Sequence, residues 1–368
     1  MMLFKVENCF PSQYTDDLNK QLALDHLIVS SGQRKNIVIL DRSIIEEILT
    51  CDLYRQPTKK YTIDIDTYRR EYGAITKKLS VYTIVDFDFE GINCTLENNQ
   101  WLIRISYNYF TNAVNSESIG LLTENELDFK FYSKIAEYYS RYISTFNIKV
   151  SFNFHFGGGS QSKAMFDRLT REGKILLCII DSDKSHPEKS EGSTSSVFTV
   201  EDRSYNNRSL VHVINVREIE TLLPLKNIEE ILSIQGVADE IEAFDEIKAF
   251  SLVNTDFRKF FDHKEGLSLK EAIELDTKYG NFWLDTLSSN KRFSSMSCLQ
   301  NKICYECESC PKVSGFGDKI LKKVVDQLEN LHLRNLEVDA SLLPNWESIG
   351  ELMMSWGCTP NIPISRSS

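Results

Sequence analysis

The sequence of 368 residues lacks long apolar runs and an excess of basic residues. No run reaches the roughly eighteen consecutive apolar residues of a membrane-spanning helix, so we expect no such helix. The first residues, MMLFKVENCFPSQYTDD, do not combine a charged start with an apolar core, so we expect a cytoplasmic protein. The formal net charge of −11 argues against a broad, non-specific surface for nucleic acid. The excess carboxylates can instead bind metal ions, because a cation cancels their charge.

The chain has nine cysteines, an odd number, and we expect reduced thiols or metal ligands rather than a disulfide framework. Four of them are clustered in CLQNKICYECESC: Cys298, Cys304, Cys307 and Cys310. Four neighbouring thiolates suit a tetrahedral, structural Zn²⁺ site. The C-x-x-C-x-x-C spacing is also compatible with an iron–sulfur cluster. Unliganded thiols or a disulfide are the third interpretation that the sequence leaves open.

The apolar pattern changes twice along the chain and predicts three domains. Residues 1–117 are expected to form an α+β domain, in which YTIVDFDFEGI and QWLIRISYNY pair as an antiparallel hairpin around TLENN. Residues 118–225 alternate between strand and helix, with strands in SIGLLTE, KVSFNFHF, KILLCII and LVHVINV. This alternation predicts an α/β domain with a mainly parallel sheet. Residues 226–368 are predicted to be mostly helical.

Carboxylates follow three of the predicted strands of residues 118–225. They are Glu124 with Asp128, Asp181 with Asp183 in ILLCIIDSDKSHP, and Glu218 with Glu220. Because parallel strands end at the same edge of a sheet, we expect these acids to lie near one another. Crowded carboxylates repel unless a cation lies between them, and hard oxygen ligands suit Mg²⁺ or Mn²⁺. Two such ions can activate water and stabilise the leaving oxygen of a phosphodiester.

These motifs resemble those of the Toprim fold, the catalytic domain of topoisomerases, primases and OLD-family nucleases. ENELD resembles the E-G-x-x-D opening of that fold, and DSD is similar to its D-x-D motif. The order of the motifs over residues 118–225 looks most like the OLD-like defence nucleases. Two positions depart from the family pattern. Asn125 replaces the usual glycine, although asparagine tolerates positive φ, and Lys184 and Ser185 stand where a third aspartate is sometimes found.

The resemblance implies a Rossmann-like Toprim domain that hydrolyses DNA or RNA by a two-metal mechanism. It implies that Glu124, Asp128, Asp181, Asp183 and Glu218 or Glu220 are metal ligands or general bases. It also implies a role in anti-phage defence beside a partner ATPase or sensor, which would supply the P-loop that this chain lacks. Lys264, C-terminal to the D-x-D, is our first choice for a positive group at the phosphate. Other basic candidates are Lys163, Lys184 and Arg217.

Each motif also has a structural interpretation. Glu124 with Asp128, or Glu218 with Glu220, is compatible with an acidic first helical turn that the helix dipole favours. Gly157, Gly158 and Gly159 predict either a phosphate-binding turn before a helix or a tight turn alone. The D-x-D pattern occurs twice more, as Asp64/Asp66 and Asp86/Asp88, where we expect the solvent side of strands. The histidines predicted to be structural or exposed are His155, His186, His212 and His263.

Two alternative functions remain open at the level of sequence. A primase-like nucleotidyl transferase would use the same ions and bind a triphosphate near the glycine turn. The basic candidates for that triphosphate are Lys163, Arg168 and Arg171. A non-catalytic scaffold with a degenerate Toprim fold is the other alternative, and the intact acids argue against it.

Overall fold

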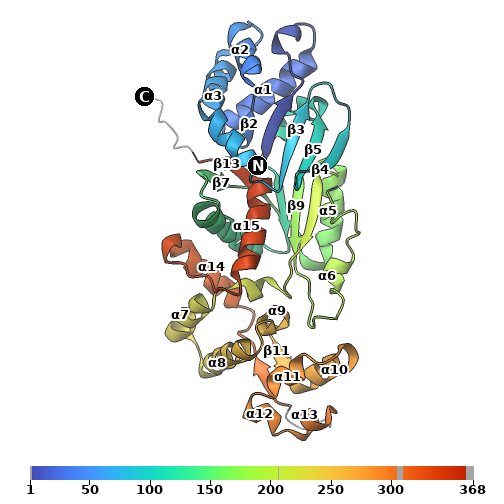
Figure 1. The fold of residues 1–368 in the computed structure, drawn as a ribbon, viewed down its shortest axis with the longest axis vertical. Coiled ribbons are helices and arrows are strands. Elements are labelled where there is room, and N and C mark those ends of the chain that lie inside the picture. Colours follow the sequence, from blue (N-terminus) through green and yellow to red (C-terminus); the bar gives the residue numbers. More distant parts are fainter. Residues whose placement is uncertain (1, 206, 305–309, 362–368) are drawn as a thin grey trace. The chain divides into compact units, whose positions relative to one another are not determined.

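The computed structural model describes residues 2–205, 207–304 and 310–361 (Figure 1). The chain divides into two compact units. Unit 1 comprises Met1–Ile179, Phe198–His212 and Glu347–Ser368, and unit 2 comprises Ile180–Val197 and Val213–Trp346. The fold is mixed α/β with parallel sheets, as the sequence predicts. The predicted domain boundaries at 117 and 225 stay predictions. No helix in the described part of the chain is long and apolar enough to cross a membrane.

A five-stranded sheet in unit 1 has the strand order β2-β1-β3-β5-β4. Its strands are β1 (Leu3–Glu7), β2 (Ile37–Ile39), β3 (Val81–Asp86), β4 (Ile92–Glu97) and β5 (Gln100–Ser106). β1 pairs in parallel with β2 and β3, and β3 pairs in parallel with β5. Only the edge pair β4–β5 is antiparallel among the described pairs of this sheet. The helices that accompany the sheet are α1 (Leu18–Gly32), α2 (Arg42–Thr50) and α3 (Gln56–Thr76).

The antiparallel hairpin predicted for residues 82–109 pairs the wrong segments. The segment YTIVD forms β3, which runs parallel to β5, whereas INCTLE forms the antiparallel partner β4. The turn between β4 and β5 contains Asn98 and Asn99, both with positive φ (50° and 63°). Two residues with positive φ are typical of a type I′ hairpin turn, and asparagine tolerates that conformation.

The sequence predicted that the two other D-x-D pairs lie on the solvent side of strands, and this prediction is wrong. Asp64 and Asp66 are exposed, but they lie on helix α3. Asp86 ends β3 and is buried, with Asn8 donating to its Oδ1 at 2.9 Å and Arg104 forming an ion pair with it. This aspartate therefore belongs to a closed polar network inside unit 1.

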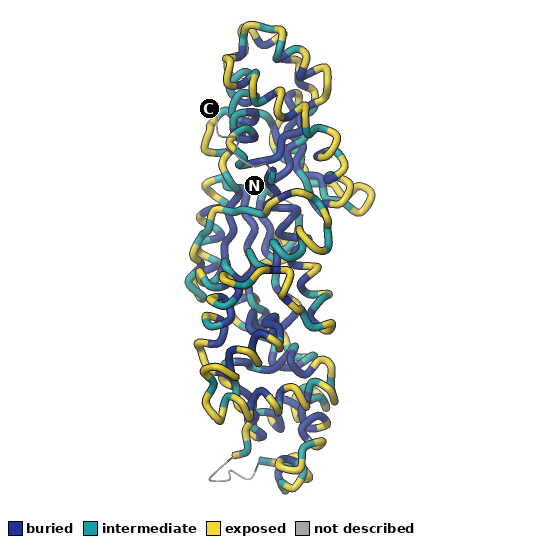
Figure 2. The backbone as a smooth tube through the Cα atoms, turned by 90° about the vertical axis from the view of Figure 1, so that its left-hand side faces the viewer, coloured by how far each residue is buried: buried dark blue, intermediate teal, exposed yellow. Residues whose placement is uncertain are grey.

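A second sheet has the strand order β10-β9-β6-β8. Its strands are β6 (Gly120–Thr123), β8 (Asn153–Phe156), β9 (Leu176–Ile180) and β10 (Ser209–Val213). β6 pairs in parallel with both β8 and β9. The helices α4 (Glu126–Tyr138) and α5 (Ser162–Arg171) contact β6. Both sheets carry long buried stretches, which Figure 2 shows in dark blue. Apart from the strand predicted in KVSFNFHF, these strands and helices agree with the sequence prediction for this region.

The predicted strand KVSFNFHF is two strands that belong to different sheets. β7 (Ile148–Val150) pairs antiparallel with β13 (Cys358–Pro360), near the end of the described chain. β7 and β13 contribute Ile148 and Cys358 to a buried apolar cluster that also contains Leu3 and Ile75. The C-terminal segment is therefore part of the core of unit 1.

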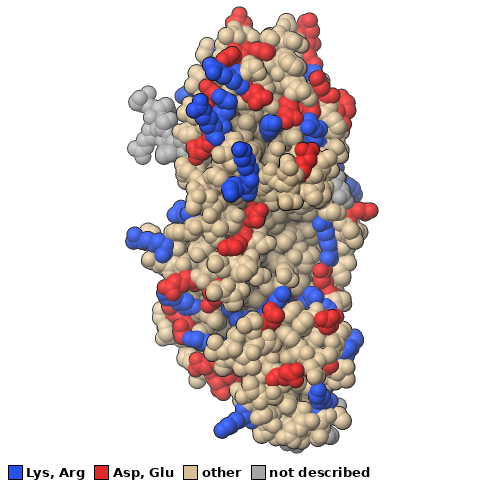
Figure 3. Space-filling view, in the orientation of Figure 1, with Lys and Arg blue, Asp and Glu red and all other residues tan. Residues whose placement is uncertain are grey.

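Unit 2 is mostly helical. Its described helices are α6 (Ser193–Ser196), α7 (Leu225–Gln235), α8 (Ala238–Val253), α9 (Phe257–Phe260), α10 (Leu269–Tyr279), α11 (Trp283–Leu287), α12 (Lys291–Ser294), α13 (Ser297–Asn301) and α14 (Ile320–Asn330). The short strands β11 (Gly266–Ser268) and β12 (Lys312–Ser314) form an antiparallel pair. Helix α15 (Leu343–Gly357) begins in unit 2 and ends in unit 1. Acidic side chains gather at the surface over α7 and α8 (Figure 3).

Candidate functional site

Glu124 and Asp128 lie where β6 leads into α4, in unit 1. Asn125 is the N-cap of α4, and its side chain accepts a hydrogen bond from the Asp128 N–H at 3.0 Å. The Asp128 carboxylate accepts one from the Asn125 N–H at 3.1 Å, which completes a capping box. Asn125 has φ of −145°, so this turn does not use the positive φ that its place in the motif suggested. The position of the buried Asp128 therefore has a structural explanation of its own.

The glycine turn packs against the same strand end. The N–H of Gly157 donates to the carbonyl of Thr123 at 2.8 Å, and that of Gly158 donates to the carbonyl of Glu124 at 2.9 Å. A Cβ on Gly157 would lie 2.5 Å from Ser162 Oγ and 2.8 Å from the Thr123 oxygen, so only glycine fits there. Two of the three glycine N–H groups are thus already bonded, which favours the tight-turn interpretation over the phosphate-binding one.

Asp181 and Asp183 follow β9 and belong to unit 2. The residue between them, Ser182, is buried and donates through Oγ to the Val216 carbonyl at 2.6 Å. The N–H of Asp183 donates to the Arg217 carbonyl at 2.8 Å. These two bonds fasten the D-x-D segment to the residues that directly precede Glu218. Asp183 has φ of 53°, a conformation that aspartate tolerates better than most residues.

Glu218 and Glu220 are buried on either side of one ammonium group. Lys264 Nζ lies 3.1 Å from Glu220 Oε1 and 3.7 Å from Glu218 Oε2. Glu218 Oε1 also accepts a hydrogen bond from the His263 N–H at 2.6 Å. The other oxygen of Glu220, Oε2, is buried and has no hydrogen-bond partner among the described residues. Glu218 is the N-cap of a short 3-10 helix, Ile219–Leu222, and Glu220 lies in its first turn, so the structural interpretation of these acids as a helix start is confirmed; both are also buried.

The electrostatics join Asp181 to this group. Burial raises the pKa of both glutamates, and mutual repulsion raises the pKa of Glu220 further, while Lys264 opposes the shift. For Lys264, burial lowers the pKa, but attraction to Glu220, Glu218 and Asp181 outweighs burial and raises it. We name Asp181, Glu218, Glu220 and Lys264 the Lys264 cluster. It brings together four residues that the sequence singled out.

The other basic candidates are engaged elsewhere. Arg217 Nη2 forms an ion pair with Asp262 Oδ2 at 2.6 Å. Lys163 Nζ, in unit 1, lies 2.5 Å from Asp167 and 3.3 Å from Asp202. The N–H of Lys184 donates to Ser182 Oγ at 3.3 Å, and its side chain is half-buried. Lys264 is thus the lysine that the structure places against the acids.

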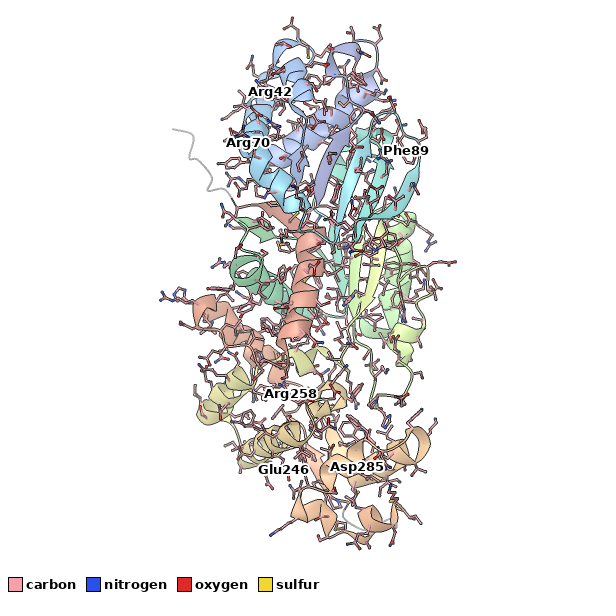
Figure 4. The ribbon with its side chains drawn as sticks, viewed as in Figure 1. Arg42, Arg70, Phe89, Glu246, Arg258 and Asp285 are labelled. Carbon is pink, nitrogen blue, oxygen red and sulfur yellow. The ribbon has the colours of Figure 1, made fainter. Side chains whose placement is uncertain are left out.

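The sequence did not single out Arg258, which supports the turn that carries the glutamates. Arg258 is buried, and Nη2 donates to the carbonyls of Thr221 at 3.1 Å and Leu223 at 2.8 Å. Arg258 lies on α9 and is labelled in Figure 4. Its Nε lies 3.4 Å from Nε2 of His263, whose own N–H binds Glu218. No spacing rule reveals such a residue, because its role depends on carbonyl groups far along the chain.

The oxygen atoms of the Lys264 cluster are of the type that binds a metal ion, but the cluster does not present a complete set of ligands. Carboxylate oxygens suit Mg²⁺ or Mn²⁺, and Glu220 Oε2 is a buried oxygen that needs a partner. In the described part of the chain, however, no three His, Cys, Asp or Glu side chains lie close enough together to hold a metal ion. The magnesium or manganese site therefore stays a prediction.

Three of the clustered cysteines line one cavity in unit 2. Cys298, Cys304 and Cys310 surround about 210 Å³ together with Leu269 and Ile273. Cys310 Sγ accepts a hydrogen bond from the Lys270 N–H at 3.3 Å. Cys307 lies outside the described residues. Zinc, an iron–sulfur cluster and unliganded thiols all stay open predictions, which metal analysis of the purified protein separates.

Two of the four predicted histidines have clear structural contacts in unit 2. His186 is buried, and its Nδ1 accepts from the Glu188 N–H at 3.1 Å, so its Nε2 donates to the Gly280 carbonyl at 3.0 Å. His263 is buried beside Arg258. In unit 1, burial lowers the pKa of His155, and lowers that of His212 to about 4. The rings of His186 and His263 thus form hydrogen bonds within the protein, and the surroundings of His155 and His212 favour the neutral ring.

Comparison with known proteins adds no family assignment. The chain matches no protein-family model, no curated protein and no solved structure.

Proposed function

We propose that this chain is a metal-dependent endonuclease of the Toprim type that hydrolyses phosphodiester bonds in DNA or RNA. The observation that carries the proposal is the Lys264 cluster, in which two buried glutamates share one ammonium group. Glu220 Oε2 has no hydrogen-bond partner in the described structure. Burying a carboxylate oxygen without a partner is costly, and such a cost is expected where a cation or substrate completes a site.

The roles follow from the chemistry of the side chains. Asp181, Asp183, Glu218 and Glu220 would hold Mg²⁺ or Mn²⁺, and the resemblance adds Glu124 and Asp128; the ion would supply an activated water and a Lewis acid. Lys264 keeps its positive charge, because the acids raise its pKa. A fixed positive charge there can stabilise the negative charge that develops on the phosphate.

The resemblance extends the proposal to anti-phage defence. The chain has no P-loop, so a partner ATPase or sensor would provide the trigger. Neither the fold nor the Lys264 cluster bears on this part of the proposal, which rests on the resemblance of residues 118–225 alone.

The arrangement favours hydrolysis over nucleotidyl transfer. Two of the three basic residues that a triphosphate near the glycine turn would need already form ion pairs. Lys163 lies within 2.5 Å of Asp167, and Arg168 Nε lies 3.7 Å from Glu172. A triphosphate would have to displace these pairs, so we rank the nucleotidyl transferase second and a non-catalytic scaffold third.

The test is a cleavage assay with the purified full chain. Plasmid, single-stranded DNA and total RNA are each incubated with Mg²⁺, Mn²⁺ or EDTA. Asp181→Asn is compared with Asp64→Asn, which changes the first aspartate of an exposed D-x-D on α3. We expect metal-dependent cleavage that falls by at least about 100-fold in Asp181→Asn and stays unchanged in Asp64→Asn. Glu124→Gln then tests whether the acid after β6 takes part.

The outcomes separate the three functions. Binding of Mn²⁺ without cleavage of any of the three substrates, together with incorporation of nucleoside triphosphates, would assign the chain to nucleotidyl transfer. Absence of both cleavage and Mn²⁺ binding would favour a scaffold and contradict the catalytic interpretation of the Lys264 cluster.

A further inference from the structure

Helix α8 in unit 2 is apolar on two faces. Ala243, Phe244, Ile247 and Phe250 are buried on one face. A helix that is covered on one side only carries one apolar stripe, with polar residues opposite. On α8 the opposite side also carries exposed apolar residues, which indicates a second covering layer that the described residues do not supply.

The second face is strongly exposed. Ile241 is 43% exposed, Leu252 is 84% exposed and Val253 is 58% exposed. Val237, directly before the helix, is 61% exposed. We define the α8 outer face as Val237, Ala238, Ile241, Ala249, Leu252 and Val253. Val237, Ile241, Ala249 and Val253 lie along one side of the helix, with Asp245 between them, because these positions follow one another at a spacing of four.

The outer face contains a groove that is lined by both apolar and acidic side chains. An open groove of about 550 Å³ is lined by Ala238, Ile241 and Ala249, together with Glu242, Asp245, Glu246 and Asn290. The two alanines leave room for larger side chains of a partner.

The three acids that line the groove are only partly neutralised. Glu246, labelled in Figure 4, forms an ion pair with Arg292 at 2.6 Å. Neither Glu242 nor Asp245 forms an ion pair with any described residue. The space-filling view also shows acidic side chains over this part of unit 2 (Figure 3).

We propose that the α8 outer face binds a basic amphipathic helix of a partner protein. Such a helix would place Leu or Ile side chains in the groove, and Lys or Arg side chains opposite Glu242 and Asp245. A second copy of this chain is the less favourable occupant, because a two-fold contact would bring the same acids against each other. The inference does not depend on the proposed nuclease activity.

The test measures binding of designed peptides to the full chain. The probe is a fluorescent amphipathic helix of about five turns built from Leu and Lys. One control peptide has the same composition in scrambled order, and another has Glu in place of Lys. Fluorescence anisotropy at physiological ionic strength gives the dissociation constants. We expect the basic amphipathic peptide to bind at least about tenfold more tightly than either control.

Variants of the protein locate the site. Leu252→Ser removes an apolar contact and Asp245→Lys reverses a charge, and each should weaken binding by about tenfold or more. Ile63→Ser, at a residue 55% exposed on α3, is the matched control and should leave binding unchanged. Circular dichroism and thermal melts of all three variants should match the wild type, because the altered residues are exposed.

Three results would overturn the proposal. The first is equal binding by wild type, Leu252→Ser and Asp245→Lys. The second is equal binding of the acidic and basic peptides. The third is a wild-type dimer that Leu252→Ser converts to a monomer in sedimentation experiments, because the outer face would then be occupied by a second copy.

Discussion

Replacing Lys264 by methionine tests whether its ammonium group holds the two glutamates in place. The substitution keeps the apolar stem and removes the charge, so Glu218 and Glu220, which are 6% and 2% exposed, would repel each other without compensation. Removing one partner of a fully buried ion pair costs about 3–5 kcal/mol. The Lys264 side chain is 35% exposed, so solvent screens the interaction. We therefore expect the free energy of unfolding to fall by about 2 kcal/mol.

Urea unfolding in EDTA, followed by tryptophan fluorescence, measures this loss, because Trp283 and Trp346 are buried in unit 2. The matched control is Lys322→Met. Lys322 is an exposed lysine on α14 that forms no ion pair with the described residues. Its replacement should change the free energy of unfolding by less than about 0.5 kcal/mol.

A double variant isolates the ion pair from other effects of the substitution. Glu220→Gln removes the charge that lies 3.1 Å from Lys264 Nζ. Because the charge left unpaired in Lys264→Met is then absent, Lys264→Met/Glu220→Gln should be more stable than Lys264→Met alone by about 1 kcal/mol. Equal stability of Lys264→Met and Lys322→Met, with no recovery in the double variant, would refute the reasoning.

Three further changes test the fold. Asp276→Ala should lower the free energy of unfolding in urea by about 3 kcal/mol. The reason is that the buried carboxylate accepts hydrogen bonds from the N–H groups of Phe282, Trp283 and Leu284 at 2.8–3.1 Å. The control Asp285→Ala, at an exposed residue of α11, should lower it by less than about 0.5 kcal/mol. Burial raises the pKa of Asp86, but hydrogen bonds from Asn8, the Asp88 N–H and Arg104 outweigh burial and lower it. Asp86 therefore stabilises the fold above the ordinary aspartate pKa of about 4 and less as the pH falls, so Asp86→Asn should be less stable than wild type at neutral pH, with a difference that shrinks near about pH 3. An identical difference at both values would contradict this. Gly73→Ala, within α3 and with no atom within 4 Å of the added Cβ, should raise stability by about 0.5–1 kcal/mol in thermal melts, and a loss would contradict the open surroundings.

The second sheet was predictable because its strands are apolar throughout. KILLCII contains β9, whose five residues are all buried, and SIGLLTE contains β6, whose four residues are all buried. Parallel strands covered on both faces give such uninterrupted runs, and helical spacing between them marks the crossovers. Gly173, with φ of 76°, directly follows Glu172, the C-cap of α5, and such a glycine is a common signal for the end of a helix.

The errors in residues 1–117 have a different origin. YTIDID alternates like a strand, but the buried face of α3 carries Thr58 and Thr62 before Ile65 and Tyr72. Because polar threonines occupy part of that face, the apolar residues alone do not show the helical period. The sequence did not predict β4, because four of its six residues are exposed and the segment therefore shows little apolar pattern.

The three D-x-D pairs show why spacing alone cannot identify a site. Asp64 and Asp66 lie exposed on α3, where water solvates them. Asp86 lies at the end of a parallel strand, as the Toprim motif requires, yet a hydrogen bond from Asn8 and an ion pair with Arg104 already compensate its charge. Asp181 lies in a cluster where a single ammonium group attracts it and two glutamates, and where Glu220 Oε2 has no partner among the described residues. The compensating charge, which only the fold reveals, is what separates an acid that stabilises the structure from an acid that can bind a metal ion.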